Sequence, residues 1–145
     1  MGGNLWFMAT REDAAILAAE RAVEATDATP GVITTFPGGI ASSASKAGSR
    51  YPFLFASTNE AYCPTLKQEL GDESRVPANV NSIMEIIING CDLDAVRQAT
   101  MASMAAASTV PGMVRISAGN FGGRLGKSFI YLPPESVADK ASASN

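Results

Sequence analysis

Apolar and polar positions repeat along the chain with two different periods, which predict strands and helices in turn. GGNLWFMA at 2–9 alternates as a strand does, with Leu5 and Phe7 on one face and Trp6 and Met8 on the other. REDAAILAAERAVEAT follows directly, is rich in helix formers and carries its apolar residues at helical spacing. The apolar stripe of this predicted helix consists of Ile16, Ala19, Ala22 and Val23.

The second half of the chain repeats the plan of the first. TPG at 29–31 ends the first helix, and the β-branched stretch VITTF predicts a short strand after it. SIMEIIING at 82–90 predicts another strand, DLDAVRQATMASMAAAS at 92–108 a helix, and MVRISAGNFGG at 113–123 a strand that ends in glycines. We therefore expect one antiparallel sheet with both helices on one face, a ferredoxin-like α+β sandwich.

Three further segments complete the expected organisation. Residues 37–81 are too long for a turn and too aromatic for a solvated linker, so we expect a long inserted loop that packs against the lobe or against a partner. SFIYL at 128–132 predicts a strand at an edge of the sheet. The polar, Ala/Ser-rich residues 133–145 predict a disordered tail, which leaves residues 1–132 as one domain.

Composition narrows the classes of function. The net charge of −3 and the lack of a basic cluster argue against nucleic acid or a membrane surface as partner, and no apolar run is long enough to span a bilayer. We find no signal peptide, so a cytoplasmic location is expected. Cys63 and Cys91 have no metal-ligand spacing and are expected to be free thiols in the core.

The chain contains no histidine, which limits the chemistry available to it. Ser-His and Cys-His nucleophile pairs and all metal sites with histidine ligands are excluded together. Catalysis by this chain would have to use carboxylates, hydroxyls, amides, backbone N–H groups, lysine or arginine.

One carboxylate, Glu85, interrupts the Met/Ile run of the strand predicted at 82–90. If Met84, Ile86 and Ile88 pack under the helices, the alternation places Glu85 on the opposite, open face of the sheet. One interpretation is a solvent-facing or edge-protecting charge. The other is a carboxyl group in an apolar, partly closed cleft, where such a group can carry a proton near neutral pH.

Three loop segments could contact a ligand. TTFPGGIASSASKAGSR at 34–50 is too irregular for a phosphate-binding loop and is either flexible or able to approach a flat or extended ligand closely. ISAGNFGGRLGK at 116–127 is a weak nucleotide fingerprint without a following helix, which favours a bulge or tight connection. ASTNEAYCPT at 56–65 is either a hydroxyl-rich ligand loop or a capped turn.

Taken together, four segments resemble one known family in order and spacing. They are GGNLWFMA, FPGGIASSASKAGSRYPFLFASTNEAYCPT, MEIIING and PGMVRISAGNFGGRLGK. The family is the formylmethanofuran:tetrahydromethanopterin formyltransferases, and the resemblance covers residues 2 to about 132. It implies that the chain corresponds to the C-terminal, distal lobe of those enzymes and that their N-terminal lobe is missing, in a fragment or in a natural single-lobed relative.

The resemblance implies an activity and a setting. Family members move a formyl group from methanofuran to a ring nitrogen of tetrahydromethanopterin, in archaeal one-carbon metabolism and in bacteria that oxidise formaldehyde. They use these carriers as substrates and no metal or prosthetic group. They have two ferredoxin-like lobes, form oligomers with clefts where lobes and subunits meet, and in bacteria can belong to a larger formyltransferase/hydrolase complex.

The resemblance also implies roles for single residues. The glutamate of the segment that matches MEIIING lies at the family's active site, so Glu85 is the expected acid–base residue. Gly119, Asn120 and Gly122 are candidate donors to the oxyanion of a tetrahedral intermediate. The candidate substrate contacts in the two hydroxyl-rich loops are Ser43, Ser45, Lys46, Thr58 and Asn59.

Two alternatives to an enzyme lobe remain open at this point. The chain could be a non-catalytic module that binds one of the carriers or organises a formyltransferase/hydrolase complex. It could also be a regulatory domain for an unrelated metabolite, an idea that rests on fold analogy alone.

Overall fold

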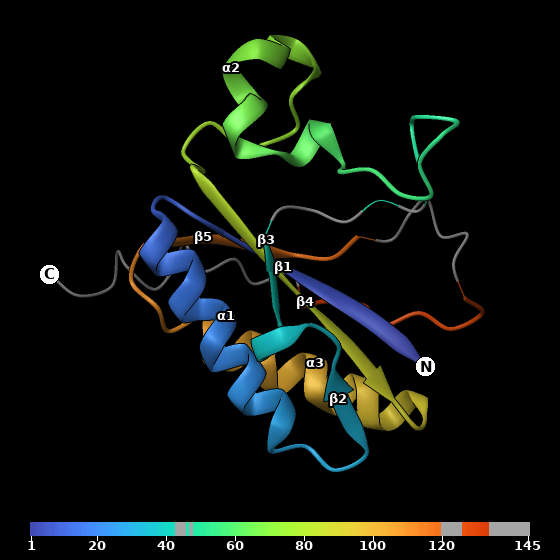
Figure 1. Ribbon diagram of the computed structural model, residues 1–145. Coiled ribbons are helices and arrows are strands. Elements are labelled where there is room, and N and C mark those ends of the chain that lie inside the picture. Colours follow the sequence, from blue (N-terminus) through green and yellow to red (C-terminus); the bar gives the residue numbers. More distant parts are fainter. Residues whose placement is uncertain (43–45, 47, 120–125, 134–145) are drawn as a thin grey trace, which may run out of the picture.

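The computed structural model describes residues 1–42, 46, 48–119 and 126–133. These residues contain five strands and three α-helices (Figure 1). In chain order they are β1 (Gly2–Ala9), α1 (Glu12–Asp27), β2 (Val32–Thr34), β3 (Ile40–Ser42), α2 (Lys67–Leu70), β4 (Ser82–Gly90), α3 (Leu93–Ala107) and β5 (Met113–Ser117). The expected α+β architecture with an antiparallel sheet is therefore confirmed.

The sheet is built around β4 and β1. Its strand order is β2-β4-β1-β5, every pairing is antiparallel, and β3 also pairs with β4. At the middle of β4, Glu85 lies opposite Trp6 of β1 and opposite Ala41 of β3. Because antiparallel partners directly opposite each other project to the same face, Trp6 and Glu85 are neighbours on one face of the sheet.

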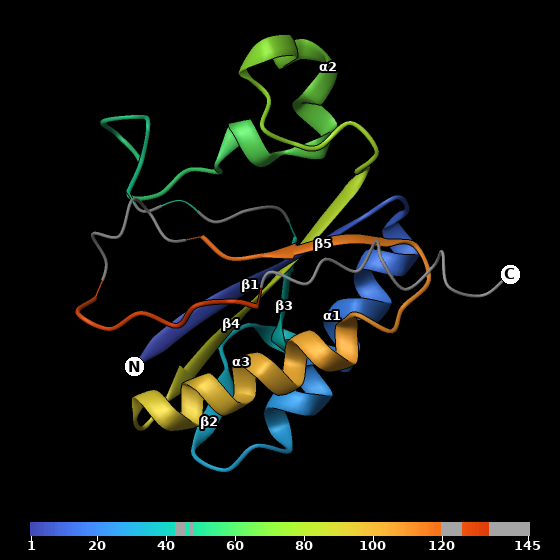
Figure 2. The same cartoon turned by 180° about the vertical axis from the view of Figure 1, so that it is seen from behind.

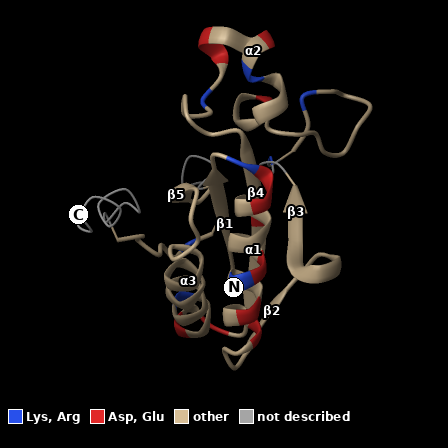
Figure 3. Ribbon diagram, turned by 90° about the vertical axis from the view of Figure 1, so that its left-hand side faces the viewer, with Lys and Arg blue, Asp and Glu red and all other residues tan. Residues whose placement is uncertain are grey.

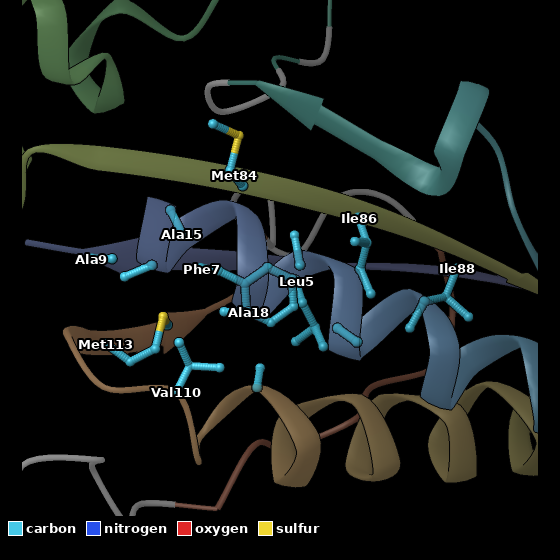
Figure 4. Close-up of a cluster of buried hydrophobic side chains, with 14 of the residues drawn as sticks. Leu5, Phe7, Ala9, Ala15, Ala18, Met84, Ile86, Ile88, Val110 and Met113 are labelled. Carbon is cyan, nitrogen blue, oxygen red and sulfur yellow. The ribbon is translucent and has the colours of Figure 1, made fainter. Parts of the chain in front are cut away.

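Helices α1 and α3 cover the other face, as Figures 1 and 2 show. Figure 4 shows strand side chains directed toward these helices, among them Leu5, Phe7, Ile86 and Ile88. Helix α1 contributes mainly small residues to this core. Its buried alanines are Ala14, Ala15, Ala18, Ala19 and Ala22.

The expected apolar stripe of α1 is partly wrong. Ile16 is 36% exposed, while Ala14, Ala15 and Ala18 are buried. Small side chains let α1 approach α3 closely, so that Ser103 of α3 donates a hydrogen bond to the Ala22 carbonyl of α1 at 3.0 Å. The close contact with α3 therefore places small side chains, and not the larger Ile16, on the buried face of α1.

An inserted segment, residues 48–81, lies on the opposite side of the sheet from the helix pair (Figure 1). It contains α2, and its side chains form a second core with the face that carries Trp6. The members of this core are Trp6, Met8, Val76, Val80 and Ile83, with Tyr62 and Val114 packed against them. The expectation that the long loop packs against the lobe is confirmed for its second half.

Lys67 at the start of α2 holds the end of the inserted segment in place. Its ammonium group donates to the carbonyl oxygens of Pro77 at 2.9 Å, Ala78 at 2.6 Å and Val80 at 3.2 Å. One cation therefore satisfies three backbone acceptors just before β4 begins.

Two expectations outside the main elements were wrong. Residues 128–132 are described and do not form a strand; Ile130 and Leu132 pack instead against the core under the helices. Cys63 and Cys91 are free thiols as expected, but neither is a core residue, because Cys63 is half-buried and Cys91 is exposed. The expected tail at 133–145 lies outside the described residues except for Pro133.

Gly39 lets the chain pass close to α1 on its way into β3. Its φ is 77°, and a Cβ atom there would lie 2.7 Å from Val23 Cγ2 and 2.8 Å from Thr34 Oγ1. Only glycine accepts both the positive φ and this proximity without strain. Within the described part of the chain, no helix is both long and apolar enough to cross a membrane.

Candidate active site

Glu85 is buried at the centre of the sheet, with 1% of its surface exposed. The core under the helices takes Met84, Ile86 and Ile88, so the predicted parity is correct and Glu85 lies on the opposite face. The strand that carries it is paired on both sides, to β1 and to β2 and β3. A solvent-facing or edge-protecting role for this carboxylate is therefore excluded.

Asn4 of β1 contacts the Glu85 carboxylate directly. Its side-chain nitrogen donates a hydrogen bond to Glu85 Oε1 at 2.8 Å. The Asn4 carbonyl oxygen accepts a hydrogen bond from the backbone N–H of Gly119 at 3.1 Å. One amide therefore joins Glu85 to the start of the glycine-rich segment after β5.

Sequence reasoning missed Asn4, although a signal was present. The alternation of β1 places Asn4 on the face of Trp6 and Met8, which makes it a polar residue on a strand otherwise buried there. The pairing of Asn4 with Ile87, two residues along β4 from Glu85, could not be known without the register.

Trp6 forms the apolar neighbour of Glu85 on this face. Its ring centroid lies 4.9 Å from that of Tyr62 in the inserted segment, and the residue is 4% exposed. Its indole N–H is buried and has no hydrogen-bond partner among the residues that the structure describes. Such an orphaned donor is uncommon in folded proteins.

Lys46 and Arg50 both pair with Glu60, which belongs to the segment 56–65. Lys46 Nζ lies 3.3 Å from Glu60 Oε2, and Arg50 Nη1 lies 3.0 Å from Glu60 Oε1. A hydrogen bond from its own backbone N–H, followed by the Lys46 bond, lowers the pKa of Glu60 below its usual value. Lys46, Arg50 and Glu60 therefore form one charged cluster, and further basic and acidic residues lie on and around α2 (Figure 3).

Thr58 and Asn59 differ in their surroundings. Thr58 lines an open pocket of about 470 Å³ in the inserted segment, together with Arg50, Tyr51 and Leu54. The Asn59 carbonyl accepts a hydrogen bond from the Tyr62 N–H at 3.0 Å and begins the turn that carries Tyr62. Thr58 is therefore accessible to a ligand, whereas Asn59 has an evident structural role.

The remaining candidates are only partly described. Ser43, Ser45, Asn120 and Gly122 lie outside the described residues. Gly119 is described, and its backbone N–H donates to Asn4. The structure thus brings Gly119 and Glu85 together through Asn4, whereas Thr58 belongs to the inserted segment and Lys46 pairs with Glu60 of that segment.

A family model described as "FTR, proximal lobe" matches residues 1–134. The chain belongs to the formylmethanofuran–tetrahydromethanopterin formyltransferase family. The predicted family is thus confirmed, but the matching model describes the proximal lobe, and our designation of the lobe as distal was wrong.

Individual members of the formyltransferase family match this chain over most of its length. The formylmethanofuran–tetrahydromethanopterin formyltransferase of Methanothermus fervidus is 52% identical over 132 residues, which are 90% of this chain and 44% of that protein. The corresponding enzyme of Archaeoglobus fulgidus is 46% identical over the same shares. The chain therefore spans less than half the length of the curated relatives that it matches.

Solved structures in the formyltransferase family share the fold. A formylmethanofuran:tetrahydromethanopterin formyltransferase from Methanosarcina barkeri superposes with a TM-score of 0.81 at 44% identity, over 86% of this chain and 42% of that one. A formyltransferase/hydrolase complex from Methylorubrum extorquens, determined with methylofuran, superposes with a TM-score of 0.79 at 42% identity, over 87% of this chain and 41% of that one.

Proposed function

We propose that this chain carries part of a formyltransferase active site, which transfers a formyl group between formylmethanofuran and tetrahydromethanopterin as one lobe of a two-lobed enzyme. The observation that carries the proposal is Glu85, a carboxylate 1% exposed on the face of the sheet opposite the helices, in a chain of this family. Membership of the family supports formylmethanofuran and tetrahydromethanopterin as the substrates, and the buried Glu85 carboxylate is a group suited to proton transfer.

In the proposed reaction, the ring nitrogen of tetrahydromethanopterin attacks the formyl carbon. A new C–N bond forms, the carbonyl electron pair moves to oxygen, and the Glu85 carboxylate takes the proton released by the attacking nitrogen. The carbonyl then re-forms, the bond to methanofuran breaks, and Glu85 returns the proton to the departing amine. Glu85 ends as it began, so the step balances with no further reactant.

The oxyanion and the carriers need further contacts, and we assign them to the remaining candidates. Asn120 and Gly122 are proposed as donors to the oxyanion, with Gly119 in the same segment. Thr58, which lines the open pocket, is proposed as a substrate contact. The other proposed substrate contacts are Ser43, Ser45, Lys46 and Asn59.

The setting of the site is also a proposal. We propose a cytoplasmic homo-oligomer or a pairing with an N-terminal lobe, without a metal or prosthetic group. The similarity to a formyltransferase/hydrolase complex supports other subunits of such a complex as partners. The strand order β2-β4-β1-β5, with α1 and α3 on one face, supports assignment to the ferredoxin-like plan.

The direct test is formyl transfer measured with the 145-residue chain, alone and together with an N-terminal lobe from a relative. Glu85→Gln keeps the size of the side chain and is expected to lower kcat by about 100-fold or more, which is the usual contribution of a general acid–base group. Glu24→Gln, at an exposed position of α1, is the matched control and should leave the rate unchanged. A Glu85→Gln protein that folds and transfers formyl groups at the normal rate would refute the role of Glu85.

The competing proposal is a non-catalytic module that binds a carrier or organises a complex. The observation in its favour is the similarity to a solved formyltransferase/hydrolase complex, which was determined with methylofuran. Binding of methanofuran or tetrahydromethanopterin to the chain, with no transfer even after an N-terminal lobe is added, would favour it. A chain that binds neither carrier, alone or together with an N-terminal lobe, would contradict both proposals.

A further inference from the structure

We infer that Asn4 is a positioning residue for the acid–base group: its amide fixes the Glu85 carboxyl group relative to the backbone that follows β5. This inference rests on the proposed function of Glu85. It concerns a residue that contacts Glu85 and Gly119.

The position of Asn4 follows from the order of the strands. Strand β1 lies between β4, which carries Glu85, and β5, which leads into the glycine-rich segment (Figure 1). The β1–β5 register pairs Trp6 with Ser117. Continued by two residues, this register brings Gly119 opposite Asn4, where the ladder has already ended. On the β5 side, the Asn4 side chain accepts the hydrogen bond from Gly119 that a continued ladder would have formed. On the β4 side, the same side chain donates to Glu85.

The bonding pattern suits an amide and no other side chain of this size. The nitrogen donates to Glu85 Oε1 at 2.8 Å, and the oxygen accepts from the Gly119 N–H at 3.1 Å. Aspartate could accept from Gly119 but could not donate to a carboxylate, and alanine could do neither. A hydrogen bond to a charged oxygen is among the stronger ones in proteins, so it restricts the rotation of the Glu85 carboxyl group.

The consequence for the proposed reaction is geometric. The proton acceptor and the segment proposed to bind the oxyanion must be held at a fixed separation, because small displacements of reacting groups cost large factors in rate. Asn4 sets that separation through two bonds from one rigid amide. It therefore acts on the reaction through Glu85 and Gly119.

The test uses two substitutions at Asn4. Asn4→Ala removes both bonds, whereas Asn4→Asp is nearly isosteric, keeps the acceptor for Gly119 and loses the donor to Glu85. Both variants are expected to lower kcat by about 10- to 100-fold, the size expected when a hydrogen bond to a charged group is lost, with KM changed less than about 3-fold. Asn89→Ala, at an exposed asparagine on β4, is the matched control and should keep wild-type kcat.

The two variants distinguish the hydrogen bond of Asn4 to Glu85 from its hydrogen bond to Gly119. If Asn4→Asp behaves like the wild type while Asn4→Ala is slow, the contact with Gly119 matters and the positioning of Glu85 is refuted. If both variants keep wild-type kcat while Glu85→Gln is inactive, the inference fails and the proposed function stands. If Glu85→Gln itself remains active, the proposed function fails.

A crystal structure of each variant gives a readout that does not depend on turnover. The Glu85 carboxyl group should leave its position or become disordered in both variants while the β4 backbone stays in place. An unmoved Glu85 carboxyl group in a folded variant would overturn the inference, whether or not the chain alone is active. Thermal unfolding confirms that each variant is folded, and Asn4→Asp keeps the test available if Asn4→Ala does not fold.

Discussion

Replacing Gly39 with alanine tests how closely the chain passes α1 before it enters β3. The positive φ of 77° costs an alanine about 1–2 kcal/mol, of which about 0.4–1 kcal/mol is offset because alanine also restricts the unfolded chain. The added Cβ would lie 2.7 Å from Val23 Cγ2, and overpacking of this kind costs about 1–3 kcal/mol. We expect Gly39→Ala to lower the free energy of unfolding by about 2–4 kcal/mol.

The neighbouring Gly38 provides a control with the same backbone requirement. Its φ is 68°, and a Cβ atom there would have no atom of the described residues within 4 Å. Gly38→Ala should therefore cost only the net backbone term of about 1 kcal/mol. Urea unfolding followed by far-ultraviolet circular dichroism gives both values under identical conditions.

The difference in unfolding free energy between Gly38→Ala and Gly39→Ala gives the cost of the steric contact at Gly39. Adding Val23→Ala to Gly39→Ala should recover part of the loss, because the nearest atoms to the new methyl group are then removed. Equal losses for Gly38→Ala and Gly39→Ala would refute the close approach of Gly39 to α1. The same result would remove our explanation for the placement of β3 beside Glu85.

Two further predictions concern the helices. Ser103 and Thr26 are buried, their hydroxyl oxygens lie 2.9 Å apart, and both hydroxyls donate to the Ala22 carbonyl. Ser103→Ala should lower the free energy of urea unfolding by only about 1 kcal/mol, because Thr26 keeps that carbonyl satisfied. A decrease above about 3 kcal/mol would contradict this account. Asp92 caps α3, and the hydrogen bond from the Ala95 N–H lowers the pKa of the Asp92 carboxyl group. The stabilisation of the fold by Asp92 is therefore present above its unfolded-state pKa and is lost as pH falls through the lower folded-state pKa. The stability advantage of the wild type over Asp92→Ala, measured by urea unfolding between pH 7 and 2.5, should shrink on acidification, and a constant difference would contradict the capping role.

The parts of the fold set by local periodicity could be predicted from the sequence. The helix expected at 11–26 is Glu12–Asp27, and the one expected at 92–108 is Leu93–Ala107. The alternation of β4 correctly placed Glu85 on the face opposite the helices. In each case a run of several residues repeats one pattern, so single exceptions do not change the prediction.

Elements that depend on distant partners could not be predicted. Strand β3 has three residues and exists because they pair with β4, whereas residues 128–132 have a strand-like composition and do not form a strand. The contact between Asn4 and Glu85 joins residues 81 positions apart, and no local sequence pattern predicts it. The candidate site was therefore predictable in its central residue and not in the residue that holds it.

The central position of β1 has a consequence for how the chain folds. Both of its partners come from much later in the sequence, since Ala9 pairs with Ser82 and Trp6 with Ser117. Long loops must close before either ladder forms, and proteins dominated by such distant pairings fold slowly. Until β4 and β5 are in place, the apolar run from Leu5 to Met8 has no cover, and a chain interrupted before β5 would keep one edge of β1 open to pairing with another molecule.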